Sequence, residues 1–272
     1  MMREQMGPDF IEALARGLDV IRAFVPHRPT MSLSEVAAAA ALARPTARRI
    51  LLTLEELGYV RSTGGVFALT PRVLELGMAY IGSSSIWEIA RPHMERLVAR
   101  TGESSSLAQL DGSDIVYVAR VAVPKVVTFA VTIGTRFPAL QTSLGKVLLA
   151  ALTPAELAHT LAEPSRSGVT PRWNPEVEQR DCALREVRAR GWALTDEELA
   201  PGIRSIAAPV RDSDAHVVAA LNICVLAAET SVATLTETYL PLLIQTADDI
   251  SADWTLRRSR PEITLSAVSA GG

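Results

Sequence analysis

The chain has 272 residues, nearly half of them apolar, and a formal net charge of −3. This length allows two domains with substantial cores. The negative net charge excludes a global positive field that would draw the protein to nucleic acid, so any DNA affinity must come from a local basic patch. The two distant cysteines, Cys182 and Cys224, exclude a disulfide framework and a cysteine zinc site.

The first nine residues lack the apolar core of a secretion signal and are expected to be disordered. No later run is apolar enough to span a bilayer, which predicts a cytoplasmic protein. An amphipathic helix follows and stops at Pro26 and Pro29. Its predicted core face consists of Ile11, Leu14, Leu18, Ile21 and Val25. Arg16 lies on the polar side, where contact with a DNA phosphate and plain solvent exposure are equally compatible with the sequence.

Two helices separated by a short break are predicted between residues 32 and 58. Ser32 with Glu35 three positions later forms a capping box at the start of the first. The second opens with Pro45 in its first turn, where a missing N–H costs nothing, and it ends at Gly58. Two strands over 59–61 and 66–69, joined through a pair of glycines, are expected to form a hairpin.

The second helix has a basic face over its first half. Its apolar positions fall on one side at 100° per residue, and the opposite side carries arginines and no acid. That face consists of Arg44, Pro45, Thr46, Arg48 and Arg49. Such a helix fits the major groove of DNA, and Arg61 in the hairpin is available to a phosphate. The alternative is a small helical bundle with a solvated basic face, but the turn length and the following hairpin favour DNA binding.

Thr70 and Pro71 begin a helix expected over residues 71–82. The segment is apolar on nearly all sides, which predicts burial partly against its own chain and partly against a partner chain. The serines at 83–85 mark a domain boundary, so we interpret this helix as a linker.

Beyond residue 85 the pattern changes to an α+β domain with helices on the faces of a sheet. The expected helices cover 86–101, 143–152, 154–162, 175–190 and a C-terminal stretch from Ser231 to about residue 257. The expected strands cover 105–110, 115–121, 126–134, 192–195, 203–210 and 217–225. Residues 258–272 are expected to form a disordered tail.

The usual enzyme signatures are missing, namely G-x-S-x-G, H-E-x-x-H, C-x-x-C and G-x-G-x-x-G. Gly145 and Lys146 lack the upstream glycine of a phosphate-binding loop. The four histidines are scattered without a second ligand type at metal spacing, and His93 on an apolar stripe is expected to be a satisfied core histidine. The acids at 196–198 offer an acid and a base, although neighbouring loop acids usually form a solvated turn. The sequence therefore predicts no catalytic, metal or cofactor site.

Residues 141–146 lead into a helix, so free N–H groups and the positive end of the helix dipole gather there. Such a site suits a carboxylate without a charged side chain. Ordinary N-capping by Thr142 or Ser143 explains the same residues equally well.

Four segments between residues 13 and 80 resemble the winged helix-turn-helix of the IclR family of bacterial transcriptional regulators: ALARGLDVIRAF, LSEVA, RPTARRILLTLEELGYV and FALTPRVLELGMAY. The resemblance continues to about residue 255. It is strongest to the Pca and Pob regulators, the subgroup that controls aromatic-acid breakdown through the beta-ketoadipate pathway. Ala43 departs from the serine N-cap that relatives often carry, a loss of about 1 kcal/mol of local helix stability.

The resemblance implies a winged helix-turn-helix domain over 10–70, a linker helix over 71–84 and a GAF-like effector-binding and oligomerisation domain over 85–257. Carried over position by position, the effector contacts are Ser143, Leu144, Gly145, Asp196, Ser205, Asn222 and Cys224. Relatives often carry small hydroxyl residues at the last two positions, which share a strand face, so the ligand chemistry is expected to differ here. Cys224 is otherwise a small buried side chain. Arg204 is a second anion candidate, with an ion pair to a nearby glutamate as the alternative.

The sequence thus predicts a regulator that binds double-stranded operator DNA as a homodimer, or as a dimer of dimers, and responds to a small carboxylate. By resemblance, the effector candidates are protocatechuate, 4-hydroxybenzoate and beta-ketoadipate. Two other classes stay open: an enzyme with a vestigial winged domain, and a purely structural dimer module.

Overall fold

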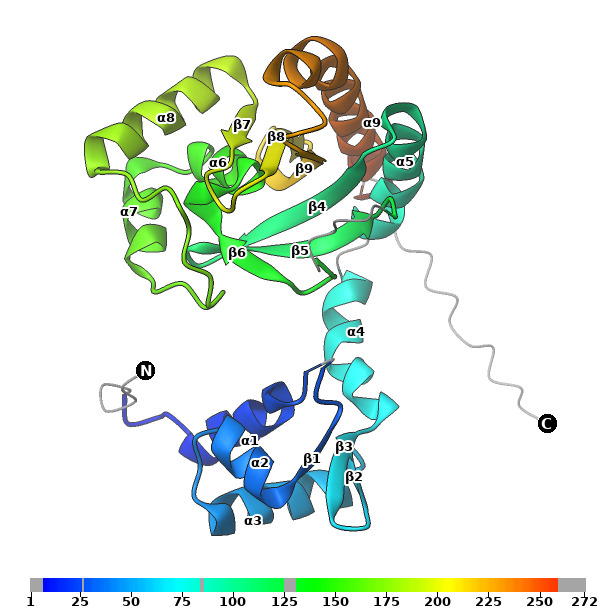
Figure 1. Cartoon of the computed structure of the whole chain (residues 1–272), viewed down its shortest axis with the longest axis vertical. Helices are drawn as coiled ribbons and strands as arrows, with labels where there is room; N and C mark the ends of the chain where they lie inside the picture. Colours follow the sequence, from blue (N-terminus) through cyan, green and yellow to red (C-terminus); the bar gives the residue numbers. More distant parts are fainter. Residues whose placement is uncertain (1–6, 26, 84–85, 125–130, 259–272) are drawn as a thin grey trace, which may run out of the picture. The chain divides into compact units, whose positions relative to one another are not determined.

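The computed structural model describes residues 7–25, 27–83, 86–124 and 131–258. The chain divides into two compact units, Met1–Ser84 and Ser85–Gly272, shown in Figure 1. No helix in these described stretches is long and apolar enough to cross a membrane. The expected disordered leader and tail fall largely on residues 1–6 and 259–272, which lie outside the described residues.

The first unit is a helical domain with a small antiparallel sheet. Its elements are α1 (Glu12–Ala23), β1 (Thr30–Ser32), α2 (Leu33–Ala39), α3 (Arg44–Glu56), β2 (Val60–Thr63), β3 (Val66–Leu69), a 3-10 turn over Pro71–Val73 and α4 (Leu74–Ser83). The predicted capping box starts α2, since the Ser32 hydroxyl accepts from Glu35 N and the Glu35 carboxylate accepts from Ser32 N. The strand order is β1-β3-β2. The sequence did not predict β1, because three residues are too short to show a period of two.

The core face predicted for α1 is wrong in part. Val20 is the fully buried residue of this helix and belongs to a core with Met31, Val36 and Leu51. Leu14 and Leu18 are instead 61% and 48% exposed. The helix carries apolar residues on two faces, and only one of them meets the core of the chain.

The burial predicted for residues 71–82 against their own chain is wrong for four large apolar residues whose exposure is described. Leu74, Leu76, Met78 and Tyr80 are each more than half exposed. Their apolar character therefore has no match in the packing of the isolated first unit.

The second unit is an antiparallel sheet with helices on both faces (Figure 1). Its helices are α5 (Ile86–Thr101), α6 (Ser143–Ala150), α7 (Pro154–Ala162), α8 (Val177–Arg190) and α9 (Leu240–Arg258). Its strands are β4 (Ser104–Asp111), β5 (Asp114–Val121), β6 (Arg136–Pro138), β7 (Ala193–Asp196), β8 (Ile203–Arg211) and β9 (Val217–Leu226), in the order β6-β5-β4-β9-β8-β7. The α+β class expected from the sequence is confirmed.

Each face of this sheet has its own core. One core joins α5 and α9 to residues such as Leu107, Ile206 and Leu221, and the other joins α6 and α8 to Ala108, Ala207 and Ala220. Successive strand residues point to opposite faces, which separates the two sets. On the α6 face the strands β4, β8 and β9 contribute alanines to the core, whereas β5 contributes Ile115 and Tyr117.

Two predictions about where elements begin had opposite outcomes. The strand predicted over 126–134 lies partly outside the described residues; its described remainder is a turn in which Thr135 N donates to Thr132 O, and strand β6 begins only at Arg136. Ser231 caps the C-terminal helix as predicted, because its hydroxyl accepts from Thr234 N at 3.0 Å. A π-helical segment over Thr234–Tyr239 then precedes α9.

Candidate functional sites

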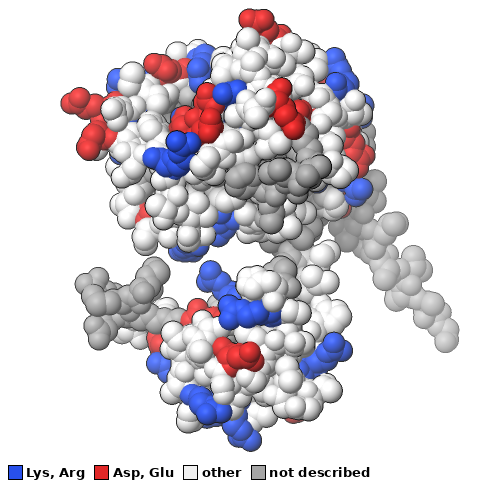
Figure 2. Space-filling view, viewed as in Figure 1, with Lys and Arg blue, Asp and Glu red and all other residues white. Residues whose placement is uncertain are grey.

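The exposed face of α3 carries the residues predicted for DNA contact. Arg44, Pro45, Arg48 and Arg49 are exposed and Thr46 is half-buried, whereas the opposite side of the helix faces the core. The first turn contains no acid, and Figure 2 shows basic side chains at the bottom of this unit, where α3 lies in Figure 1. None of the three arginines forms an ion pair within the described residues, so their charges are available to phosphates or base edges.

The β2–β3 hairpin stands beside α3. Gly64 and Gly65 both have positive φ, as a tight two-residue hairpin turn requires. Ser62 N donates to Glu55 Oε1 at 3.0 Å, which fixes the hairpin to the end of α3. Arg61 on β2 is exposed. This is the position a wing residue needs to reach a phosphate.

Two details modify the predicted DNA contacts. Ala43 is the N-cap of α3 and makes no side-chain capping bond, in keeping with the expected loss of a cap. Arg16 on α1 is half-buried and pairs with Glu12, its Nε lying 2.8 Å from Oε1. An approaching phosphate would compete with this carboxylate for the guanidinium.

The start of α6 is capped as one alternative expects, and it keeps the free donors that the other alternative needs. Thr142 is the N-cap, and its hydroxyl accepts from Gly145 N at 3.0 Å, so ordinary capping is present. The N–H groups of Ser143 and Leu144, both fully buried, form no hydrogen bond within the described residues. These two donors lie at the positive end of the helix dipole and can receive an anion.

Gly145 has a packing role. A Cβ on this residue would overlap the backbone of Ala139 in the preceding 3-10 turn, Ala139–Gln141. With its N–H taken by Thr142, Gly145 brings α6 close to this turn and offers no free donor.

The hydroxyl groups of Ser143, Ser205 and Thr195 form a cluster. Ser143 Oγ lies 2.7 Å from the Oγ of Ser205 on β8, which lies 2.9 Å from the Oγ1 of Thr195 on β7. All three residues are buried. Hydroxyls can donate or accept, so this cluster can serve a ligand hydroxyl or carboxylate.

Asn222 and Cys224 share the α6-facing side of β9, two residues apart. Asn222 Oδ1 accepts from Ser106 N at 2.9 Å on the neighbouring strand β4. Cys224 is partly exposed and lies opposite Ser104 and Ser205 in the sheet register. The sheet thus brings Asn222, Cys224, Ser205 and Ser143 to one side.

Asp196 and Arg204 bind each other at the sheet edge. Arg204 Nε lies 2.7 Å from Asp196 Oδ1, and Arg204 Nη1 also donates to Thr230 O. The ion-pair alternative for Arg204 is therefore the one observed, although the partner is an aspartate and not the glutamate expected. The Asp196 carboxylate is already engaged, which weakens its case as an effector contact.

A buried ion pair lies along α6 and was missed from the sequence. Lys146 Nζ is 2.7 Å from Glu198 Oε1 and 4.4 Å from the ring centroid of Trp173. Burial is the main cause that lowers the pKa of Lys146 and raises the pKa of Glu198, and each charge partly offsets the shift of the other. A lysine directly before an apolar run was the available signal. The loop 196–198 is thus held against α6 and is not simply a solvated turn.

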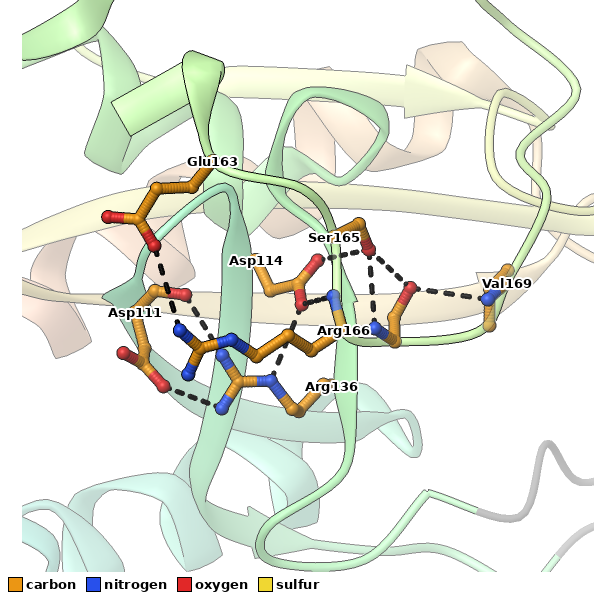
Figure 3. A network of polar contacts seen from close by, with 8 residues as sticks. Asp111, Asp114, Arg136, Glu163, Ser165, Arg166 and Val169 are labelled. Atoms are coloured by element: carbon orange, nitrogen blue, oxygen red, sulfur yellow. Dashed lines mark hydrogen bonds and ion pairs between the residues drawn. The ribbon is translucent and has the colours of Figure 1, made fainter. Parts of the chain in front are cut away.

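A second polar network, in Figure 3, fastens the connection between α7 and α8 to the β4–β5 hairpin. The buried Asp114 accepts from Ser165 Oγ at 2.6 Å and from Arg166 N at 2.7 Å. Arg136 on β6 lies between Asp114 and Asp111 and binds the latter at 2.6 Å. These contacts anchor the first part of the α7–α8 connection, and Trp173 lies further along the same connection.

The histidines take two different roles. His93 is nearly buried, with Nε2 2.8 Å from Asp253 Oδ2 and Nδ1 2.7 Å from Arg96 Nη2, so it is the satisfied core histidine expected. His216 corrects the expectation that no histidine stands near another ligand type, because it lies with Asp212 and Asp214 in the β8–β9 turn. Asp212 Oδ1 there accepts from Asp214 N and His216 N, which explains the grouping without a metal.

Comparisons with known proteins agree with this architecture. A model of the bacterial transcriptional regulator IclR C-terminal domain matches residues 78–252, and one of the IclR helix-turn-helix domain matches residues 13–64. The Pca regulon regulatory protein of Pseudomonas putida is 36% identical over 244 residues, which cover 89% of this chain and 84% of that protein. The p-hydroxybenzoate hydroxylase transcriptional activator of Acinetobacter baylyi is 32% identical over 247 residues, covering 89% and 91%.

A solved IclR homologue from Microbacterium hydrocarbonoxydans, complexed with 4-hydroxybenzoate, covers 91% of this chain and 100% of its own, with a TM-score of 0.76 and 26% identity. The winged first unit, the α+β second unit and these matches over most of the chain lead to one conclusion. The chain belongs to the IclR family of bacterial transcriptional regulators and resembles its Pca and Pob members.

Proposed function

We propose that the first unit binds a two-fold symmetric operator, with α3 in the major groove and the β2–β3 hairpin beside the backbone. The observation that carries this proposal is the exposed, unpaired arginine face of α3. Arg44, Thr46, Arg48 and Arg49, with Pro45 at the helix start, would contact bases or phosphates. Arg61 would contact the DNA backbone. Arg16 would also contact it, by leaving its ion pair with Glu12 and binding a phosphate. A regulator of bacterial chromosomal DNA works in the cytoplasm.

The protein is proposed to act as a homodimer, with pairing of dimers as a further step. A groove of about 700 Å³ in the first unit is bounded by α1, α3 and α4, and apolar side chains dominate its walls. Its rim includes the exposed residues Leu14, Leu18, Leu57 and Leu76. A second copy packed against these rim residues would bury apolar surface that one chain leaves in water.

The second unit is proposed to bind a hydroxylated aromatic carboxylate without converting it. Buried polar side chains gather on the α6 side of the sheet, next to two unused N–H groups. Two similar proteins are named for the Pca regulon and for p-hydroxybenzoate hydroxylase, and a third was solved with 4-hydroxybenzoate. Ser143, Leu144, Ser205, Asn222 and Cys224 are the proposed contacts, with Gly145 and Asp196 shaping the site. The linker over residues 71–84 would carry the response to the DNA, provided that the ligand binds two dimer arrangements with different affinity.

The test is operator binding by the full chain, measured by fluorescence anisotropy with the DNA upstream of its own gene at a stated salt concentration. Protocatechuate, 4-hydroxybenzoate and beta-ketoadipate are added in turn, and one of them should change the affinity. If Arg48 reads a base, Arg48→Ala should weaken binding by about 1–3 kcal/mol. If Arg48 binds a phosphate, the variant should reduce the slope of log affinity against log salt concentration by about one. Arg185→Ala, on the exposed side of α8, removes the same charge and should change neither.

Three outcomes would contradict the proposal. Unchanged affinity of Arg48→Ala would remove α3 as the recognition helix. A specific complex that ignores every acid would remove the ligand class and keep the regulator. Consumption of an added acid, with no specific complex at moderate salt, would favour the enzyme alternative.

A further inference from the structure

A β-bulge turns one arginine toward the α6 side of the sheet. The register between β4 and β5 shifts between Leu107 and Ala108, so that Ala108 lies opposite Tyr117 and Ser106 lies opposite Arg120. Tyr117 and Arg120 are three residues apart and would face opposite sides of a regular strand. The extra residue of the bulge puts both on the face of Ala108 and Ser106.

The same face can be followed across the sheet through the strand pairs. Arg120 on β5 lies opposite Ser106 on β4, which lies opposite Asn222 on β9. Asn222 lies opposite Ala207 on β8, a member of the core beneath α6. Arg120 therefore belongs to the row that carries the proposed effector contact Asn222.

Arg120 has no counter-charge in the described part of the chain. It is half-buried, and its Nη1 donates to the Oγ of the fully buried Ser106 at 3.0 Å. No carboxylate pairs with it among residues 7–25, 27–83, 86–124 and 131–258. A guanidinium partly withdrawn from water normally has a carboxylate or phosphate partner, because a neutral hydroxyl accepts one bond and leaves the charge uncompensated.

Two buried neighbours also have unused donors. Asn222 is 3% exposed, and its Oδ1 must be the atom that accepts from Ser106 N, which directs the Nδ2 group away from the backbone. Neither Nδ2 nor the hydroxyl of Tyr117, which is 7% exposed, forms a hydrogen bond within the described residues. Neither atom is among the fully buried side-chain polar atoms that lack a partner in the described chain, so both donors are open to water or to a ligand.

We propose that Arg120 binds the carboxylate of the effector, assisted by the Nδ2 group of Asn222, and so decides that the ligand must be an anion. This proposal rests on the proposed effector function and assigns its charge recognition to a residue outside the α6 helix start. The carboxylate accepts from the Arg120 guanidinium in the row Arg120–Ser106–Asn222. The donors at Ser143, Ser205 and Thr195 then serve the opposite, hydroxyl end of the ligand.

The spacing of the strands fits a ligand with polar groups at both ends. The Arg120 guanidinium reaches Ser106 on β4, and Ser205 lies on β8 two strands away, roughly 10 Å across the sheet. Between these ends the intervening strand β9 contributes Asn222, opposite Ser106, and Cys224, opposite Ser205. A benzene ring with a carboxylate and a distant hydroxyl matches this arrangement, whereas a short aliphatic acid would reach only one end.

The test compares an acid with its neutral carboxamide by isothermal titration calorimetry on the full chain. The probes are 4-hydroxybenzoate and protocatechuate, each paired with its amide. Arg120→Gln should weaken binding of the acid on the order of 10- to 100-fold and leave the amide nearly unchanged, because only the ionised partner is lost. Arg120→Lys keeps the charge but lacks the two parallel N–H donors of a guanidinium. Its affinity for the acid should lie between those of wild type and Arg120→Gln.

Arg188→Gln is the matched control. Arg188 donates to Ala150 O and Leu152 O at the opposite end of α6, so this variant loses the same charge without changing the acid-to-amide ratio. If wild type prefers the acid and Arg120→Gln keeps that preference, Arg120 is not the anchor, while the effector function stands. If wild type binds no acid, the proposed ligand class and the role of Arg120 fail together. Loss of both acid and amide binding in Arg120→Gln, with an unchanged melting temperature, also overturns the charge-specific role.

Discussion

At the scale of single residues, the contact between Lys146 and Glu198 shows how burial governs this domain. Both charges are largely withdrawn from water, with side-chain exposures of 6% and 20%, and Trp173 covers the ammonium. Burial lowers the pKa of Lys146 below 10.5 and raises that of Glu198 above 4.5, because each neutral form is favoured away from water. Removing one partner leaves an uncompensated buried charge, which costs more than the pair contributes.

Glu198→Gln should therefore lower the free energy of unfolding by about 3 kcal/mol at pH 7. The loss should shrink as pH rises towards 10.5, the ordinary pKa of lysine. Without Glu198 the pKa of Lys146 in the folded variant falls further. At alkaline pH, Lys146 is then protonated in the unfolded variant but has lost its proton in the folded variant. Stability rises with pH wherever the unfolded state binds more protons than the folded state. Urea unfolding at pH 7 and 9.5 measures both effects.

Glu197→Gln is the control, because Glu197 is 39% exposed and lies 3.4 Å from Arg172. A surface pair of this kind contributes about 0–1 kcal/mol, so little change is expected at either pH. A Glu198→Gln loss that is equal at both pH values would show that the Lys146 ammonium is hydrated in the variant and does not titrate early.

At the scale of elements, α6 depends on one close approach. Gly145 lets this helix touch the turn Ala139–Gln141, and Thr142 ties the two together by capping α6 while donating to Ala139 O. The start of α6 carries the donors proposed for the ligand, so a change in this packing would also disturb the proposed ligand site.

Gly145→Ala should destabilise the second unit by about 3 kcal/mol, since the added methyl meets backbone that cannot move aside cheaply. It should also weaken 4-hydroxybenzoate binding, because α6 must shift. Gly77→Ala in α4 is the control: nothing lies within 4 Å of its Cβ position, and alanine favours a helix by about 1 kcal/mol over glycine. Thermal unfolding and calorimetry check both variants, and a stable Gly145→Ala protein with normal binding would show that the approach is not required.

At the scale of the whole molecule, the apolar groove of the first unit is the surface on which the homodimer is proposed to form. Leu14 and Leu18 of α1 lie on its rim with Leu57 and Leu76, all in contact with water in the single chain. Exposed apolar surface that is continuous and grooved marks an interaction site more often than isolated apolar residues do.

Leu18→Glu should shift the proposed dimer towards monomer and lower operator affinity about 10-fold or more, because a charge placed in the contact must be desolvated and one half-site is lost. The fold should survive, since Leu18 is half exposed in the chain alone. Sedimentation at several protein concentrations and anisotropy with operator DNA provide the measurements. Val177→Glu, at the exposed start of α8, is the control. A Leu18→Glu protein that stays dimeric would place the dimer contact on another surface.

Local signals in the sequence determined much of this protein. Three helix-end signals depend only on residues a few positions away, so they could be recognised without knowing the fold. They are the capping box at Ser32, the proline in the first turn of α3 and Gly58 after its end. The basic face of α3 followed from helical period alone, and the C-terminal helix followed from its cap at Ser231. The α+β class of the second unit followed from alternating strands between helices.

Only the tertiary structure decided which buried groups meet. Lys146 and Glu198 are far apart in the chain, as are Ser143 and Ser205, and their contacts depend on how α6 packs on the sheet. The period of two that orients strand residues breaks at the β4–β5 bulge, so Arg120 could not be assigned to the α6 face from spacing. Likewise α1 has two apolar faces, and the sequence could not tell which one the chain itself would bury. Non-local packing settles these cases because it selects among faces that local patterns leave equivalent.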